Sequence, residues 1–235
     1  MNIEKRFSRF LDKPYREIDA DFIADVVHKI KNGLGGIGGF AALLERDLDD
    51  NDPRQRLVGR IQDGVIRLNE LAVDLTLVSR PVIPHCRSLP IIPLWQDLWN
   101  SLFCENPEKG IPLVIDDQID GKKTFFHGDQ RLLEILVYKM IQFIESLGGK
   151  ISRAGIQIAG NHELALVLAV DTRRSTTFRE KLEQFLQNQK PLEARLSFAL
   201  AIKLIEIHHG RVTIHSNRHD LELISIIKTE NSADE

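Results

Sequence analysis

The stretch that decides the fold is Phe22–Leu44, FIADVVHKIKNGLGGIGGFAALL, which lies within a longer run of apolar residues spaced alternately four and three apart. This spacing forms one apolar stripe along an α-helix and continues over several heptads. The stripe comprises Ile23, Val27, Ile30, Leu34, Ile37, Ala41, Leu44 and Leu48. The sequence therefore predicts a long amphipathic helix that begins near Asp19.

A second helix is expected directly after the dense turn signal Asp49–Pro53, because proline suits the first turn of a helix. Its apolar stripe has the same kind of spacing and comprises Leu57, Ile61, Gly64, Leu68, Leu71, Leu75 and Val78. So short a loop joins antiparallel helices. One hairpin alone leaves apolar surface bare, so we expect a homodimer whose two hairpins form a four-helix bundle.

The pattern becomes mixed after the proline-rich residues 81–93. Strands are expected at Ile111–Ile115, Gly155–Ile158, Leu164–Val170, Arg211–His215 and Leu221–Ile227, and helices at Asp129–Leu147, Phe178–Gln187 and Leu192–His208. Because strands and helices interleave without a regular βαβ order, the expected class is α+β, with an α/β sandwich after the hairpin. The predicted segments are an N-terminal extension (1–18), the hairpin (19–82), a linker (83–92) and the α/β domain (93–235).

The composition is that of a soluble globular protein, with 43% hydrophobic residues, 28% charged residues and a net charge of −3. So small a charge gives no general attraction to nucleic acid, and no nucleic-acid partner is expected. No apolar run approaches the ~20 residues of a membrane span, so we expect a cytoplasmic protein. Cys86 and Cys104 have no metal or redox spacing and are expected to be free thiols.

His28 follows Val27 of the apolar stripe and is therefore expected just outside it, facing solvent, with Asn32 one turn later on the same face. An exposed neutral imidazole is a competent nucleophile toward a phosphoryl group, although the same position also suits an ordinary surface histidine. Glycines follow at positions 33, 35, 36, 38 and 39, and each costs roughly 1 kcal/mol in a helix interior. They would let the acidic pocket of a partner come close; a flexible or kinked helix is the alternative.

Phe22–Leu44 resembles the phosphoacceptor box of bacterial two-component histidine kinases, His-Glu-(Leu/Ile)-(Arg/Lys)-(Asn/Thr)-Pro-Leu followed by small residues and an apolar run. It is most similar to the nitrogen-regulation sensor type, which reads His-Glu-Ile-Lys-Asn-Pro-Leu and then Gly-Gly-Ile. The residues that match are His28, Ile30, Lys31, Asn32 and Leu34. Lys29 replaces the acid and Gly33 replaces the proline. The resemblance implies that His28 is the phosphate acceptor.

The same resemblance assigns roles to two neighbours of His28. The acid that normally follows the histidine is thought to act as general base in autophosphorylation, which a protonated Lys29 cannot do at neutral pH. Lys29 is instead suited to neutralising an arriving phosphate. Asn32 stands where the family positions water for dephosphorylation of a partner, so that activity remains possible.

The second half resembles the ATP-binding domain of these kinases more weakly. Asp129–Phe143 lines up approximately with the helix Asp-x-x-Arg-Leu-x-Gln-Val-Leu-x-Asn-Leu-x-x-Asn-Ala, whose second asparagine normally holds Mg²⁺. Tyr138 and Gln142 stand at the two asparagine positions. Leu196–Ile202 resembles Gly-Leu-Gly-Leu-Ala, with Ser197 and Ala199 in place of the glycines, and Ile205–Ser216 keeps a His-x-Gly hairpin signature.

Val170–Ser175 resembles the Asp-x-Gly-x-Gly box, with Asp171 kept and both glycines replaced, by Arg173 and Ser175. Asp171 and Gln142 are therefore expected to be remnants of a nucleotide site that no longer binds ATP and Mg²⁺, so no cofactor is expected. Arg173 and Arg174 either retain some affinity for anions or form a solvated surface pair. The histidines His208, His209, His215 and His219 match no familiar ligand spacing, and no metal site is expected.

An intact acceptor box beside eroded nucleotide boxes favours a histidine phosphotransfer protein, similar to the phosphotransferases of sporulation and cell-cycle relays that derive from kinases. It would pass a phosphoryl group between response-regulator receiver domains through His28, with autokinase activity lost. A divergent but active ATP-dependent sensor kinase is one alternative. A non-catalytic scaffold or phosphatase that acts on a response regulator is the other.

Overall fold

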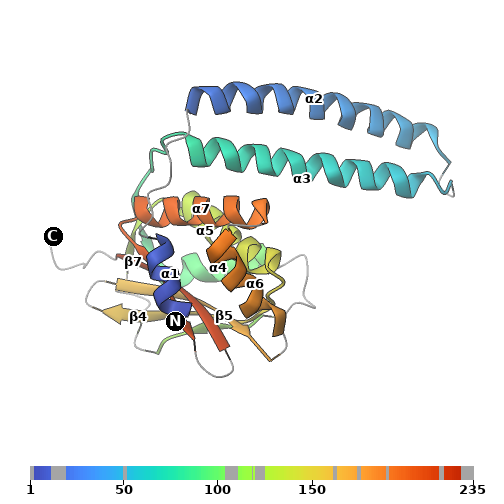
Figure 1. Ribbon diagram of the computed structural model, residues 1–235. Helices are drawn as coiled ribbons and strands as arrows, with labels where there is room; N and C mark the ends of the chain where they lie inside the picture. The colour runs from blue at the N-terminus through green and yellow to red at the C-terminus, as the bar shows by residue number, and fades with distance from the viewer. Residues whose placement is uncertain are drawn as a thin grey trace. The chain divides into compact units, whose positions relative to one another are not determined.

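The computed structural model describes residues 3–11, 20–49, 52–103, 111–117, 119, 125–160, 163–173, 176–188, 191–216 and 220–228. It separates into two compact units. One unit is the hairpin, Tyr15–Val82, and the other combines Met1–Pro14 with Ile83–Glu235. Figure 1 shows the secondary-structure elements of both units. We refer to the second one as the sandwich unit.

The hairpin consists of α2 (Ala20–Asp47) and α3 (Gln55–Ser79), which lie side by side in opposite directions (Figure 1). The turn is closed by Asp52, whose Oδ1 accepts the Arg54 backbone N–H at 2.8 Å. The Arg54 guanidinium also donates to Asp52, and these hydrogen bonds lower the pKa of Asp52 to about 2. The predicted antiparallel hairpin is confirmed, and α2 is one continuous helix through all five glycines.

The apolar stripe predicted on α2 divides into two sets. Alternate positions of the stripe, Val27, Leu34 and Ala41, are buried in the contact with α3. The intervening positions, Ile30, Ile37 and Leu44, are about half exposed, and so are Leu57, Ile61 and Leu68 of α3. This agrees with the expectation that one hairpin alone leaves apolar surface bare. Two helices in contact cover only part of each apolar face, and the rest stays open to solvent.

The sandwich unit contains a five-stranded sheet in the order β2-β4-β5-β7-β6. The strands are β2 (Leu113–Ile115), β4 (Ile151–Gly160), β5 (Glu163–Asp171), β6 (Arg211–Ser216) and β7 (Asp220–Lys228). Only the β2–β4 pair is parallel. Helices α5 (Gln130–Ser146) and α7 (Leu192–Ile207) lie together over one face of the sheet (Figure 1), and every second residue of β7 from Leu221 to Ile227 is buried. The predicted α+β class is confirmed.

Several elements were not predicted. They are α1 (Ile3–Leu11), β1 (Arg87–Pro90), α4 (Ile91–Phe103) and β3 (Phe125–Gly128). Helix α6 (Thr176–Asn188) corresponds to the helix predicted at Phe178–Gln187. Strand β1 lies inside the stretch expected to be a linker and pairs with β3 in a separate two-stranded sheet. Its partner is far away in the sequence, so the local proline pattern could not reveal it.

His208, one of the histidines examined as metal ligands, has a role in the fold. Its Nδ1 lies 2.7 Å from the Leu204 carbonyl oxygen, and its Nε2 accepts the Asp129 backbone N–H at 3.3 Å. Burial lowers the pKa of His208, which keeps the ring neutral. Asp129 in turn caps α5 by accepting the Leu132 N–H. The ring therefore ties the end of α7 to the start of α5.

Candidate functional site

His28 is on the exposed side of α2, as predicted. The Asn32 side-chain Nδ2 lies 3.3 Å from His28 Nε2, one helical turn away. An amide nitrogen only donates hydrogen bonds, so this contact fits the tautomer with its proton on Nδ1 and a lone pair on Nε2. In this tautomer Nε2 carries its lone pair, which the hydrogen bond from Asn32 engages. Lys29 is exposed beside it.

The face of α2 that bears His28 carries Asn32 one turn later and glycines two and three turns later. Gly35 and Gly39 share this face, because they come two and three helical turns after His28. A Cβ added at either position would meet nothing within 4 Å. Gly38 differs, since its Cβ would touch Val65 of α3 at 3.5 Å. Packing within the hairpin therefore does not require glycine at positions 35 and 39.

Gln142, predicted to stand at the position of the Mg²⁺-holding asparagine, takes part in an internal hydrogen bond of the sandwich unit. Gln142 is on α5 and its Oε1 accepts from Lys139 Nζ at 2.8 Å. Lys139 is buried and also lies 5.2 Å from the centre of the Tyr138 ring. A buried ammonium at this point repels a divalent cation and engages the amide oxygen that would bind it. Sequence reasoning missed Lys139, because its importance depends on this burial.

Asp171, the second residue predicted to be a remnant of a nucleotide site, accepts hydrogen bonds from its own chain. It ends β5, is nearly buried, and accepts the Arg173 backbone N–H at 2.9 Å. The Arg173 guanidinium donates to both carboxylate oxygens, at 3.1 and 3.2 Å, and these hydrogen bonds raise the pKa of Arg173. The arginine that replaces the first glycine of the box therefore covers the acid that the box retains. Arg174, Ser175, His219 and Cys104 lie outside the described residues.

The segment Leu196–Ile202, which resembles the Gly-Leu-Gly-Leu-Ala box, lies within a helix. Helix α7 begins at Leu192, so Ser197 and Ala199 lie in its interior rather than at its start. Backbone N–H groups in a helix interior donate to carbonyls one turn earlier, and only those of the first turn are open to an anion. Both residues are also buried. This segment therefore cannot present backbone N–H groups to phosphate.

A cluster of phenylalanines fills the space between the helices around these remnants. Phe143 of α5 lies 5.1 Å from Phe185 of α6 and 4.7 Å from Phe198 of α7, measured between ring centres. All three rings are buried. Aromatic packing of this kind stabilises a closed core and leaves no space between these rings for a ligand.

The hairpin is similar to a known protein family. Residues 19–81 match the His Kinase A (phospho-acceptor) domain. The chain is 24% identical over 220 residues to the Autoinducer 2 sensor kinase/phosphatase LuxQ of Vibrio parahaemolyticus, which covers 85% of this chain and 25% of that protein. It is 28% identical over 211 residues to the sensor histidine kinase AruS of Pseudomonas aeruginosa, a match that covers 83% of this chain and 21% of that protein. The chain spans a quarter or less of these relatives' length.

Solved structures show the same fold. Full-length ShkA in complex with AMPPNP superposes with a TM-score of 0.66 at 16% identity, over 92% of this chain and 47% of that one. Histidine kinase ThkA in complex with response regulator protein TrrA gives a TM-score of 0.59 at 19% identity. The match covers 96% of this chain and 64% of that one. The order of hairpin and sandwich along the chain is thus the same as in these two structures. Within the part of the chain described above, no helix is long and apolar enough to cross a membrane.

Proposed function

We propose that this chain, which has the core of a two-component histidine kinase, relays phosphoryl groups between response-regulator receiver domains through His28 without using ATP. The observation that supports the relay most strongly is a contrast between the two units. In the hairpin, His28 is exposed and oriented by Asn32. In the sandwich unit, each remnant of the nucleotide site is engaged by groups of the chain itself.

The proposed transfer step is a displacement at phosphorus. The hydrogen bond from Asn32 to Nε2 of His28 breaks, and the freed lone pair attacks the phosphorus of an aspartyl phosphate. An Nε2–P bond forms, and the P–O bond to the aspartate breaks. The aspartate leaves as a carboxylate, and the proton on Nδ1 stays on the ring. Lys29, next to His28, offsets the charge of the incoming phosphate. The reverse reaction passes the group to a second receiver.

The open glycine positions suit the approach of such a receiver. A partner whose phosphoaspartate must come within about 3–3.5 Å of Nε2 has to approach the helix backbone closely. Gly35 and Gly39 lie on the face of His28 and offer no side-chain obstacle. Asn32, which the family resemblance links to dephosphorylation, lies on the same face. The homodimer proposed from the exposed apolar residues would leave this face free, since those residues follow a different side of α2.

ATP-dependent autophosphorylation, as in an active histidine kinase, is a second candidate function, and one observation favours it. The curated relatives are sensor kinases, and the chain matches them over both units. The engaged remnants favour the relay instead, because a kinase of this chain would have to release Asp171 from Arg173 and Gln142 from Lys139 before binding nucleotide. The two functions therefore differ in a measurable property, the affinity for ATP and Mg²⁺.

The experiment that separates them compares two phosphoryl donors. We expect no heat of binding with ATP and Mg²⁺ up to millimolar concentrations, and no label on the protein from radiolabelled ATP. Incubation with a phosphorylated receiver domain should instead label the chain within minutes, with a bond stable in base and labile in acid. Label from ATP that disappears in His28→Ala would establish the kinase and overturn the relay. If neither donor labels the protein, the result would contradict both the relay and the kinase and would favour a non-catalytic scaffold.

A double substitution tests whether the glycines serve partner approach. Gly35→Ala with Gly39→Ala should stabilise the hairpin by roughly 1–2 kcal/mol, because alanine is the better helix former and both positions are open. The same protein should lose at least about tenfold in the rate of transfer from a phosphorylated receiver. Urea unfolding and rapid-quench transfer measure the two effects. Unchanged transfer with higher stability would contradict the close-approach role, and Ala42→Gly on the same helix serves as the inverse control for stability.

A further inference from the structure

His208 is a buried titratable side chain at which several elements of the sandwich unit meet. It follows the last residue of α7, and its ring lies 5.5 Å from the ring of Phe126 on β3, measured between ring centres. A Cβ added at Gly128, the last residue of β3, would come within 2.8 Å of the imidazole. The ring is therefore packed against both a side chain and the backbone of β3.

Both nitrogens of the His208 ring take part in hydrogen bonds. Nδ1 donates to the Leu204 carbonyl oxygen, and Nε2 accepts the Asp129 backbone N–H. Only a neutral imidazole offers one donor and one acceptor, since both nitrogens of a protonated ring donate. Protonation therefore sets two N–H groups against each other at Nε2 and breaks the hydrogen bond from Asp129.

Asp129, whose N–H would lose this acceptor, is also the N-cap of α5. Its carboxylate accepts the Leu132 N–H at 3.2 Å through Oδ1 and the His85 N–H at 2.8 Å through Oδ2. The carboxylate thus joins the segment before β1 to the start of α5. Burial works to raise the pKa of Asp129, but these backbone hydrogen bonds outweigh it and lower the pKa. The carboxylate is therefore still charged at about pH 5.

Two charged groups act on the His208 ring. The Asp129 carboxylate favours the protonated ring, and His209 disfavours it. Burial has the largest influence, and it holds the pKa of His208 below the ordinary value of about 6.5. The titratable side chains nearest in sequence on the segment before β1, on β3, on α5 and on α7 are exposed, and they belong to His85, His127, Arg131 and Glu206.

We propose that His208 is an acid-sensitive latch of the sandwich unit, closed when its ring is neutral and opened when the ring takes up a proton. In the open state Nε2 carries the added proton and donates it to the Asp129 carboxylate, which the charged ring attracts. The carboxylate leaves the N–H groups of Leu132 and His85. The first turn of α5 and the segment before β1 are released together, while the five-stranded sheet keeps its hydrogen bonds. The latch does not depend on the proposed relay.

The latch makes the stability of the sandwich unit depend on pH in a definite direction. An unfolded histidine has a pKa of about 6.5, and burial in the folded unit holds the pKa of His208 below this value. Between the two values the unfolded chain binds more protons than the folded one. The contribution of His208 to stability is therefore complete above about pH 6.5 and is lost as the pH falls through the folded pKa.

Thermal unfolding of the full chain at about pH 8 and about pH 5 tests the latch. The fluorescence of Trp95 and Trp99, both on α4, reports on the sandwich unit. Its melting temperature should fall by at least about 4 °C more in the unaltered protein than in His208→Gln. Glutamine has an amide oxygen to accept the Asp129 N–H and takes up no proton in this range. The matched control His127→Gln removes an exposed histidine from β3 and should keep the full decrease. An equal decrease in all three proteins would overturn the latch.

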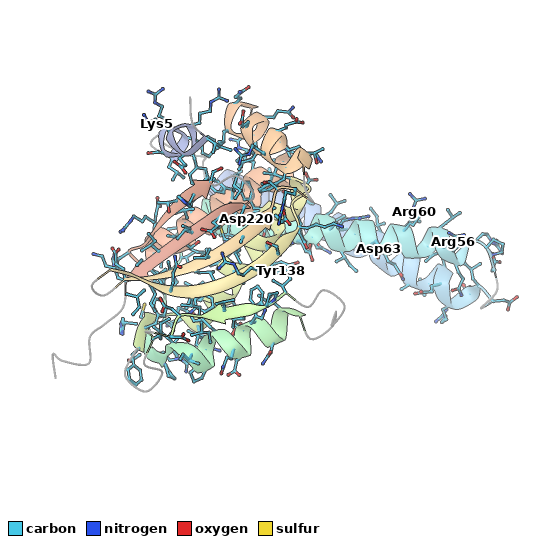
Figure 2. The ribbon with its side chains drawn as sticks, turned by 90° about the horizontal axis from the view of Figure 1, so that it is seen from below. Lys5, Arg56, Arg60, Asp63, Tyr138 and Asp220 are labelled. Carbon is cyan, nitrogen blue, oxygen red and sulfur yellow. The ribbon has the colours of Figure 1, made fainter. Side chains whose placement is uncertain are left out.

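NMR of the unaltered protein gives a second test, which holds even if His208→Gln fails to fold. The ring proton Hε1 of His208 should titrate below about pH 6.5. As the ring takes up its proton, the protection of the His85 and Leu132 amides against hydrogen exchange should fall at least about tenfold. The amide of Tyr138, further along α5 and labelled in Figure 2, is the reference and should keep its protection. Unchanged protection at His85 and Leu132, or an equal loss at all three amides, would contradict a local latch.

Discussion

A His28→Ala protein is expected to take up no phosphoryl group from a phosphorylated receiver, a loss of at least about 1,000-fold in the transfer rate. The substitution removes the only group in our scheme that bonds to phosphorus. Alanine is a good helix former and His28 is exposed, so α2 should keep its stability. Rapid-quench transfer from a radiolabelled receiver measures the rate, and circular dichroism checks the helix.

The matched control is His85→Ala, which removes another exposed histidine, in the stretch before β1. It should transfer at the rate of the unaltered protein. If the label persists on His28→Ala and is lost from His85→Ala, the phosphate acceptor would be His85 in the sandwich unit, and the assignment of His28 would be wrong. Full biological activity of His28→Ala in cells would instead favour a scaffold that only docks its partners.

The second large effect is expected on the homodimer. Ile37→Asp should weaken the proposed dimer by about 10⁴-fold, because each copy would bring an unpaired carboxylate into the bundle at roughly 3 kcal/mol or more. Ile37 is 51% exposed in the single hairpin and is in line with Ile30 and Leu44. Sedimentation velocity across a concentration series measures the dissociation constant.

Leu43→Asp provides the control, because Leu43 is 48% exposed but lies roughly 240° around α2 from Ile37. It should leave the dimer intact. Since it shares the side of the helix that bears Asn32, it should act on receiver transfer instead. A dimer that both substitutions disrupt equally, or that neither disrupts, would contradict the assignment of the Ile30–Ile37–Leu44 side to the partner hairpin.

The sequence alone was sufficient for the hairpin, the exposure of His28 and most of the sandwich. These features depend on local rules: heptad spacing, turn residues and the alternation of apolar side chains within one element. The prediction of altered nucleotide boxes also came from the sequence, because the residues at the glycine and asparagine positions are read directly from the chain. The roles of Asp171 and Gln142 as site remnants stay predictions.

Tertiary structure decided the features that depend on contacts between distant residues. Periodicity could not separate the positions of α2 that face α3 from those left for a partner, because both sets have the same spacing. Burial makes Lys139 the partner of Gln142, and the turn after β5 brings Arg173 back onto Asp171. Helix α1 packs on a strand some two hundred residues later, a pairing that no local pattern encodes. Local propensity thus determined the elements, and long-range packing determined which of their faces are occupied.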